Sequence, residues 1–322
     1  MKFARPKLLV SKCLEFDSCR YNGMRLNSPL VYKLQNFVDF IPVCPEVAIG
    51  LGIPRTPIRM INIEKDLRLQ EVGTNKDFTH KMNKFSSDFF DTLDEIDGAI
   101  LKSRSPSCAL KDAKINNGDT GLEKIEHLKA GFFAKYLYKH FPFIPKEDEG
   151  RILSYKIRDE FLIKIFIFSE WREIRKNHNI SSLITFHTKH KYMLMSYDQN
   201  ELHKLGNIVA CYDKNNGDEV FRAYERFFQE LFLKTRTQKN FLNAISHMFG
   251  YFKNNISSQE KQFFLDTVEL YKEDRVPTGV LIHMIKGWAI AYNNDYILKQ
   301  SILNPYPKEL IELSDSGKKI KI

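Results

Sequence analysis

Residues 7–13 read KLLVSKC, a short run of β-prone side chains that ends in a cysteine. The pattern returns in residues 37–43, which lead directly into Cys44. A third run, residues 99–102, precedes Cys108 by a few positions. Each run is bounded by turn-forming residues, as expected of strands. The first part of the chain therefore predicts three strands, each followed by a cysteine.

Helical signals lie between these strand runs. Ser28 and Pro29 are typical of a helix start, with proline at the first helical position, and open a helix over residues 30–35. Apolar residues then recur at helical spacing from residue 78 to residue 93. Strands that alternate with helices predict an α/β domain with a parallel, Rossmann-like sheet, which we assign to residues 1–145.

The character of the sequence changes near residue 145. Two prolines and an acidic cluster interrupt the pattern in residues 141–150, and long amphipathic stretches follow. We therefore predict that residues 146–322 form an all-α domain. Seven helices are expected, over residues 153–177, 181–197, 201–212, 219–235, 239–253, 258–272 and 280–291.

The chain has 322 residues, with 49 Lys and Arg against 40 Asp and Glu, a formal net charge of +9. This basic excess favours a polyanionic partner such as nucleic acid or an anionic membrane surface. The most apolar stretches, residues 161–171 and 280–292, carry charges before they reach the length of a membrane span. The N-terminal apolar run is too short for a signal peptide. We expect a cytoplasmic protein with no membrane partner, and no stable protein partner is implied.

Five cysteines, an odd number, do not indicate a disulfide framework in a reducing compartment. Cys13, Cys44 and Cys108 are expected to meet beyond the carboxyl ends of the strands, where open α/β sheets bind ligands. Separated cysteines without a Cys-x-x-Cys pair suit an iron–sulfur cluster with one open iron, or a zinc site with an open position. The alternative is that they are buried thiols that only pack. Cys19 and Cys211 are interpreted as structural or incidental.

Four blocks of the first half occur in a characteristic order: VSKCL with RYNG at residues 10–23, PVCPE at 42–46, GLGIPR at 50–55 and SPSC at 105–108. Together they resemble the TudS-type thiouracil desulfidase family. One departure is Ala109, where a glycine is expected in most relatives, which puts the local backbone in question.

A second set of blocks consists of GFFA at residues 131–134, EGR at 149–151, FHTKHKY at 186–192 and GYFK at 250–253. These resemble the YbgA-type helical domain. The fusion of the two domains is the layout of the RudS-type tRNA desulfidases, which remove sulfur from 4-thiouridine in tRNA. The resemblance thus implies tRNA containing thiolated uridine as the partner, and uridine and hydrosulfide as products.

The resemblance also implies a 4Fe-4S cluster held by Cys13, Cys44 and Cys108. An open iron would bind the soft thiocarbonyl sulfur and polarise the adjoining carbon for attack by water, with no net redox change. Glu46, two residues after Cys44, matches the family's glutamate and is the expected general base.

Two serines and an arginine complete the expected site. Ser105, by its match to the family's serine, is expected to be catalytic and to hydrogen-bond the substrate base or the attacking water. Ser107 and Arg55 are expected substrate contacts. The alternatives are that both serines only stabilise the turn at Pro106 and that the arginine lies on the surface.

The helical domain carries basic residues flanked by aromatics, a combination that suits RNA backbone and splayed bases together. The predicted RNA-binding residues are Lys189, Lys191, Lys234, Arg236 and Lys253. The alternative is a solvated helix face with its aromatic side chains in the core. Because the target base is normally stacked, we expect the nucleotide to be extruded into the cluster pocket.

Three other functions compete with a tRNA desulfidase. The chain could desulfurise free thiouracil or a thionucleotide, with the helical domain serving another purpose. It could be a non-catalytic iron–sulfur sensor or nucleic-acid-binding module, although a sensor needs no base beside a ligand. It could also be a zinc enzyme, which the colour of the purified protein would decide.

Overall fold

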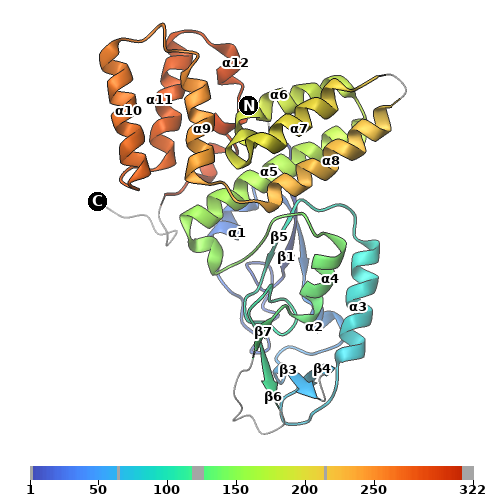
Figure 1. Ribbon diagram of the computed structural model, residues 1–322. Helices are drawn as coiled ribbons and strands as arrows, with labels where there is room; N and C mark the ends of the chain where they lie inside the picture. The colour runs from blue at the N-terminus through green and yellow to red at the C-terminus, as the bar shows by residue number, and fades with distance from the viewer. Residues whose placement is uncertain (1–2, 64–65, 118–126, 214–215, 314–322) are drawn as a thin grey trace. The chain divides into compact units, whose positions relative to one another are not determined.

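A four-stranded parallel sheet organises the N-terminal part of the protein, seen in a computed structural model that describes residues 3–63, 66–117, 127–213 and 216–313 (Figure 1). Its strands are ordered β2-β1-β5-β8. Their bounds are Lys7–Ser11 (β1), Asp39–Val43 (β2), Gly98–Leu101 (β5) and Lys146–Asp148 (β8). The three predicted strands are confirmed as β1, β2 and β5.

The central strand β1 is apolar because both of its faces are covered. Leu8, Leu9 and Val10 have no exposed surface, as expected of a strand buried between two layers. The strand pairs with β2 on one side and β5 on the other. The chain therefore leaves β1 toward one edge of the sheet and later returns on the opposite side of β1, and open α/β sheets bind ligands beyond the carboxyl ends of their strands at such a reversal.

Helices between the strands supply the rest of this core. They are α1 (Pro29–Leu34), α2 (Pro45–Ala48), α3 (Thr79–Thr92) and α4 (Phe132–His140). Helix α1 begins at Pro29 after Ser28, as predicted. Helices α3 and α4 lie side by side in Figure 1, and the rings of Phe90 and Phe133 approach to 4.8 Å between them.

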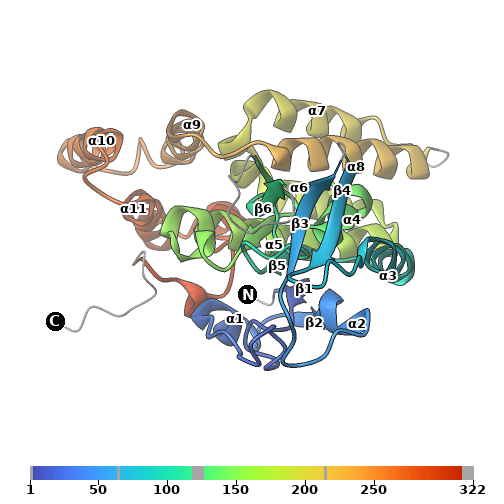
Figure 2. The same ribbon diagram turned by 90° about the horizontal axis from the view of Figure 1, so that it is seen from below.

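A second sheet was not predicted. Its strands are β3 (Ile58–Ile63), β4 (Asp66–Glu71), β6 (Ala113–Asn117) and β7 (His127–Lys129), in the order β4-β3-β6-β7. Strands β3 and β4 pair antiparallel, whereas β3 and β6 pair parallel. In Figures 1 and 2 this sheet lies at one end of the first sheet.

The chain divides by its contacts into two units, Met1–Glu170 with Glu309–Ile322, and Trp171–Lys308. The division falls within α5, whose first residues belong to unit 1 and whose last residues belong to unit 2. The predicted domain boundary between residues 145 and 146 rests on sequence character and stays a prediction.

The C-terminal half is helical, so the predicted class, α/β followed by all-α, is confirmed. The seven predicted helices are found within a few residues of their predicted ends: α5 (Tyr155–Asn177), α6 (Ile180–Tyr197), α7 (Gln199–Ala210), α8 (Gly217–Leu233), α9 (Gln238–Phe249), α10 (Ser258–Lys272) and α11 (Thr278–Ala291). A short helix α12 (Asp295–Leu298) and 3₁₀ turns at Arg151–Leu153, Ser301–Leu303 and Lys308–Leu310 complete the structure.

Unit 2 is built around aromatic side chains. The ring of Trp171 lies 5.2 Å from that of Tyr224 and 5.3 Å from that of Phe228, and all three side chains are buried. Capping fixes several helix starts: Asn179 accepts backbone hydrogen bonds at α6, and Ser257 forms a capping box at α10. In the described part of the chain, no helix combines the length and the apolar character needed to cross a membrane.

Candidate active site

The three predicted cluster ligands follow three neighbouring parallel strands. Cys13 stands two residues after β1, and Cys44 directly follows β2 and begins α2. Cys108 lies in the loop after β5. The backbone carbonyl of Cys13 accepts a hydrogen bond from the amide of Leu26 at 2.8 Å, which closes the loop between β1 and α1. The backbone thus places all three cysteines beyond the carboxyl ends of β1, β2 and β5, where they were expected to meet.

The Cys108 loop is held by Ser105 and by the start of α4. The Ser105 hydroxyl oxygen accepts hydrogen bonds from the backbone amides of Ser107 at 3.2 Å and Cys108 at 3.1 Å. The carbonyl of Ser107 in turn accepts from two amides of α4, at 3.0 and 3.2 Å. A Cβ on Gly131 would lie 2.4 Å from that carbonyl oxygen, so only glycine allows this approach.

Two of the blocks that resemble the YbgA-type helical domain, GFFA at residues 131–134 and EGR at residues 149–151, lie in unit 1 and support the candidate site. The GFFA block at residues 131–134 holds the Cys108 loop. Ala109, the departure from the family pattern, causes no strain: it lies outside the left-handed region, and its amide donates to the Ser105 carbonyl at 3.1 Å.

The EGR block at residues 149–151 supports the end of β5. The Glu149 carboxylate accepts hydrogen bonds from Lys102 Nζ at 2.5 Å and from the Ser103 amide and hydroxyl at 2.8 and 2.7 Å. Burial alone would raise the pKa of Glu149, but these hydrogen bonds hold that pKa below its ordinary value. The carboxylate thereby fixes the first residues of the loop that leads to Cys108.

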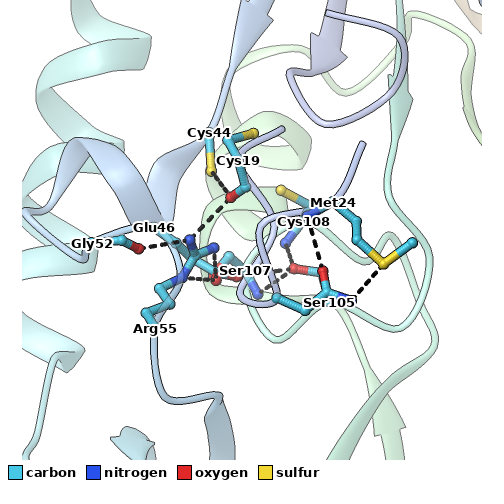
Figure 3. Close-up of polar contacts among 10 residues, drawn as sticks. Cys19, Met24, Cys44, Glu46, Gly52, Arg55, Ser105, Ser107 and Cys108 are labelled. Carbon is cyan, nitrogen blue, oxygen red and sulfur yellow. Dashed lines mark hydrogen bonds and ion pairs between the residues drawn. The ribbon is translucent and has the colours of Figure 1, made fainter. Parts of the chain in front are cut away.

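Cys19 lies among the predicted ligands. The Cys44 thiol donates to the Cys19 carbonyl oxygen at 3.8 Å (Figure 3). A hydrogen bond with the Cys13 thiol raises the pKa of Cys19 to about 11. A hydrogen bond with Cys19 and burial raise the pKa of Cys44, and burial raises the pKa of Cys108. The sequence placed Cys19 six residues after Cys13, and its contact with two predicted ligands was missed.

The thiols of Cys13, Cys44 and Cys108 are chemically suited to hold an iron–sulfur cluster. The thiols come from three loops and lie close enough to interact electrostatically, and thiolates are the usual ligands of iron–sulfur clusters. Within the described residues, no three His, Cys, Asp or Glu side chains stand as they would around a single metal ion. Cysteines of a cluster bind different iron atoms and so stand farther apart than ligands of one ion. The roles of Cys13, Cys44 and Cys108 as ligands stay predictions.

Glu46 occupies the centre of the site. Its carboxylate is 14% exposed and meets Arg55 on one side, with Nη2 at 2.6 Å and Nε at 3.1 Å from Oε2. On the other side, Oε1 accepts from the Ser107 hydroxyl at 3.0 Å and lies 3.4 Å from the Ser105 hydroxyl (Figure 3). Both predicted serines thus face the predicted base, and Ser107 makes the shorter contact.

The predicted RNA-binding residues lie in unit 2 in differing surroundings. Lys191 is half-buried, with Nζ 5.6 Å from the centre of the Tyr192 ring. Arg236 is half-buried over Tyr197, with 6.0 Å from the guanidinium carbon to the ring centre. Lys189 is half-buried on α6, and Lys253 is exposed after α9. Their RNA contacts stay predictions.

Two acidic side chains lie beside Lys234. Its Nζ lies 2.7 Å from Asp198 and 3.4 Å from Glu201. The hydrogen bond from Lys234 to Asp198 raises the pKa of the lysine. Its positive charge is therefore offset within the protein.

The aromatic and histidine residues beside these cations are largely internal. His190 and Tyr192 are buried, so they cannot contact nucleic acid in this structure. Burial also lowers the pKa of His187 to about 4, which leaves this imidazole neutral near pH 7. Tyr251 is 45% exposed and lies 3.4 Å, oxygen to oxygen, from Tyr192. Of the predicted aromatic surface, Tyr251 is available for stacking.

Comparison with known proteins matches the two halves separately. Residues 8–149 match the model of the family described as 2-thiouracil desulfurase, and residues 191–307 match a family described as protein of unknown function (DUF1722). The uncharacterized protein YbgA of Escherichia coli is 26% identical over 162 residues, which cover 49% of this chain and 95% of YbgA.

The first half has a relative and a solved structure of its own. The uncharacterized protein YbbK of Bacillus subtilis is 30% identical over 125 residues, which cover 37% of this chain and 82% of YbbK. A structure of the [4Fe-4S]-dependent thiouracil desulfidase TudS is 26% identical and covers 46% of this chain and 93% of its own, with a TM-score of 0.38. The family model and YbbK, not this superposition, carry the assignment: through residues 8–149 the chain belongs to the 2-thiouracil desulfurase family.

Proposed function

We propose that this protein is a desulfidase that converts 4-thiouridine in tRNA to uridine and releases hydrosulfide. The observation that carries the proposal is the placement of Glu46 between Arg55 and Ser107, two residues after Cys44. Membership of the 2-thiouracil desulfurase family supports the reaction type. 2-Thiouridine is a second candidate substrate, and we place the reaction in the cytoplasm.

A 4Fe-4S cluster fits the donor set, with Cys13, Cys44 and Cys108 as its holders. When bound, it would supply a soft Lewis acid for the thiocarbonyl sulfur of the substrate. Each ligand thiol must lose its proton to bind metal. The backbones of the Cys13 and Cys108 loops are held by Leu26, by Ser105 and by the start of α4, and these contacts do not use the thiol protons.

Glu46 is the group that moves a proton. Oε1 is the oxygen that Arg55 does not engage, and it faces the serine hydroxyls. A water molecule would give its proton to Oε1 while its oxygen forms a bond to the thiocarbonyl carbon. As the carbon–sulfur bond breaks, the added hydroxyl becomes the carbonyl and its proton leaves on the sulfur as hydrosulfide, while Glu46 returns the first proton to solvent. Water supplies the new oxygen and no electrons are exchanged, so the reaction needs no oxidant or reductant.

The serine hydroxyls orient this step. Ser107 donates to Glu46 Oε1 at 3.0 Å and is fully buried. The Ser105 oxygen already accepts two backbone amides, so its one proton is what it offers toward Glu46 or a substrate atom. Ser105 therefore both shapes the Cys108 loop and stands beside the base.

The helical domain would hold the RNA. The net charge of +9, exposed Lys253 and part-exposed Tyr251 support a surface for backbone phosphates and a stacked base. Phosphate contacts make such binding weaken with rising salt. Extrusion of the target nucleotide would bring the thiolated base to Glu46 at a cost of a few kcal/mol.

The test is an assay of anaerobically purified, iron-reconstituted protein with bulk thiolated tRNA, with free 2-thiouracil in parallel. Loss of 4-thiouridine with equal release of sulfide is the expected result. Sulfide released from 2-thiouracil but not from tRNA would replace the tRNA proposal with a small-molecule desulfidase. A brown, iron-loaded protein inactive on both would leave a sensor, and a colourless zinc protein would overturn the cluster.

A further inference from the structure

Arg55 is buried, and its hydrogen bonds in the structure go to protein. Its side chain is 6% exposed. Nε and Nη2 donate to Glu46 Oε2, while Nη1 donates to the carbonyl oxygens of Cys19 at 3.0 Å and Gly52 at 3.2 Å (Figure 3). Three segments thus meet at one guanidinium: the loop after β1, the first turn of α2 and the turn that leads to β3.

This geometry differs from that of a substrate contact. A guanidinium that binds a phosphate or a base points its planar fork at the ligand. In this structure the fork faces Glu46, and Nη1 donates to the carbonyl oxygens of Cys19 and Gly52. Buried ion pairs are poor sources of stability, because taking both charges out of water offsets their attraction. The fork of Arg55 is better suited to hold the Glu46 carboxylate in a fixed orientation than to stabilise the fold.

The two carboxylate oxygens of Glu46 have different neighbours as a result. Oε2 faces two guanidinium nitrogens, and Oε1 faces the hydroxyls of Ser107 and Ser105. The planar fork fixes the plane of the carboxylate as well as its position. Without Arg55, the plane of the carboxylate could turn about the side-chain bonds of Glu46, and neither oxygen would be held toward the serines.

We propose that Arg55 is a positioning residue that makes Glu46 Oε1 the oxygen that accepts the proton from water. The inference rests on the proposed desulfidase function and replaces substrate contact as the role of Arg55.

The same guanidinium also ties the base to the ligand loops. The Cys19 carbonyl accepts both from Arg55 and from the Cys44 thiol. When Cys44 gives up its proton to bind iron, Arg55 remains the donor to that carbonyl. The backbone amide of Arg55 also donates to the Tyr21 carbonyl at 2.8 Å. These two contacts join the loop after β1 to the turn that leads to β3, and neither of them uses the proton of the Cys44 thiol.

The test compares Arg55→Gln, Arg55→Lys and Arg55→Ala, with Arg68→Gln as a matched exposed control on β4. Each variant is reconstituted, and iron content, kcat and KM are measured with 2-thiouracil. Because a positioned general base contributes about 10²- to 10⁴-fold, Arg55→Gln should lower kcat about a hundredfold or more, with KM within about threefold and normal iron content. Arg55→Lys should fall in between, since ammonium lacks the fork.

Added guanidinium ion should restore part of the kcat of Arg55→Ala and leave Arg68→Gln unchanged. A raised KM with unchanged kcat would return Arg55 to substrate binding. Loss of iron in both Arg55→Gln and Arg55→Lys would make its role structural and overturn positioning. Wild-type protein without activity on 2-thiouracil or thiolated tRNA would instead contradict the proposed desulfidase function. This outcome distinguishes a failure of the proposed function from a failure of the positioning role of Arg55.

Discussion

The site around Glu46 and the basic residues of unit 2 differ in how their charges are used. Glu46 and Arg55 are buried together, and each contact has a defined partner and direction. Lys234, in contrast, is exposed and already paired with acidic neighbours, whereas Lys253 is exposed after α9. Buried charges must be placed by the fold, while surface charges gain their role from a partner. The candidate active site can therefore be described by its geometry, whereas the proposed RNA contacts are tested by binding experiments.

Removing a ligand thiol should have the largest effect. Cys13→Ser, Cys44→Ser or Cys108→Ser should lose the iron and reduce desulfuration to background, since each thiolate would hold a different iron. Iron content and sulfide release measure this, with exposed Cys211→Ser as the control. A Cys108→Ser protein with full iron and full rate would remove that residue from the ligand set.

Glu46→Gln should separate chemistry from cluster assembly. The amide keeps the size of the side chain but cannot take the proton from water, so kcat should fall about 10²- to 10⁴-fold with iron content unchanged. Steady-state kinetics with 2-thiouracil measure the loss, and Glu71→Gln on β4 is the control. A rate near that of the wild type would contradict the general-base role.

The basic residues should act on tRNA and not on the free base. Lys253→Ala should weaken tRNA binding and reduce the slope of log affinity against log salt by about 0.7 to 0.9, the change for one phosphate contact. Lys234→Ala should do less, because Asp198 and Glu201 already offset that charge. Binding titrations over a salt series, with Lys272→Ala as control, test this. Equal losses on tRNA and 2-thiouracil would contradict an RNA-specific role.

His187 should contribute a small pH dependence of stability in unit 2. Burial lowers its folded-state pKa from 6.5 to about 4, so the unfolded chain binds the proton first. The free energy of unfolding should therefore fall as pH drops from about 6.5 to about 4. Thermal unfolding of His187→Asn should show less of this fall, whereas exposed His203→Asn should follow the wild type. Identical pH curves for His187→Asn and the wild type would refute it.

The sequence allowed prediction of the elements whose signals are local. Ser28 and Pro29 mark the start of α1, and the spacing of apolar residues marks the helices of the second half. Strands β3 and β6 were missed because their pairing joins segments far apart in the chain, although Ile58, Met60 and the next apolar residues of β3 offered a signal.

The sequence allowed us to name candidate site residues, but it did not allow us to predict the contacts among them. Cys13, Cys44 and Glu46 were identified from their blocks. That Arg55 faces Glu46 depends on a turn that brings its amide to the Tyr21 carbonyl, and the contacts of Cys19 depend on the same loop. Neither is set by spacing along the chain. Tertiary hydrogen bonds decide whether an arginine nine residues from a glutamate lies on the surface or beside it.

The most direct test of the account is desulfuration of thiolated tRNA in ¹⁸O-labelled water by the iron-reconstituted protein, with sulfide and nucleosides measured together. Because water adds to the thiocarbonyl carbon and hydrosulfide leaves, we expect one ¹⁸O in uridine for each sulfide released, and Glu46→Gln should form both products at least about a hundredfold more slowly. Sulfide release without ¹⁸O in uridine, or 4-thiouridine left intact by fully iron-loaded protein, would contradict the account.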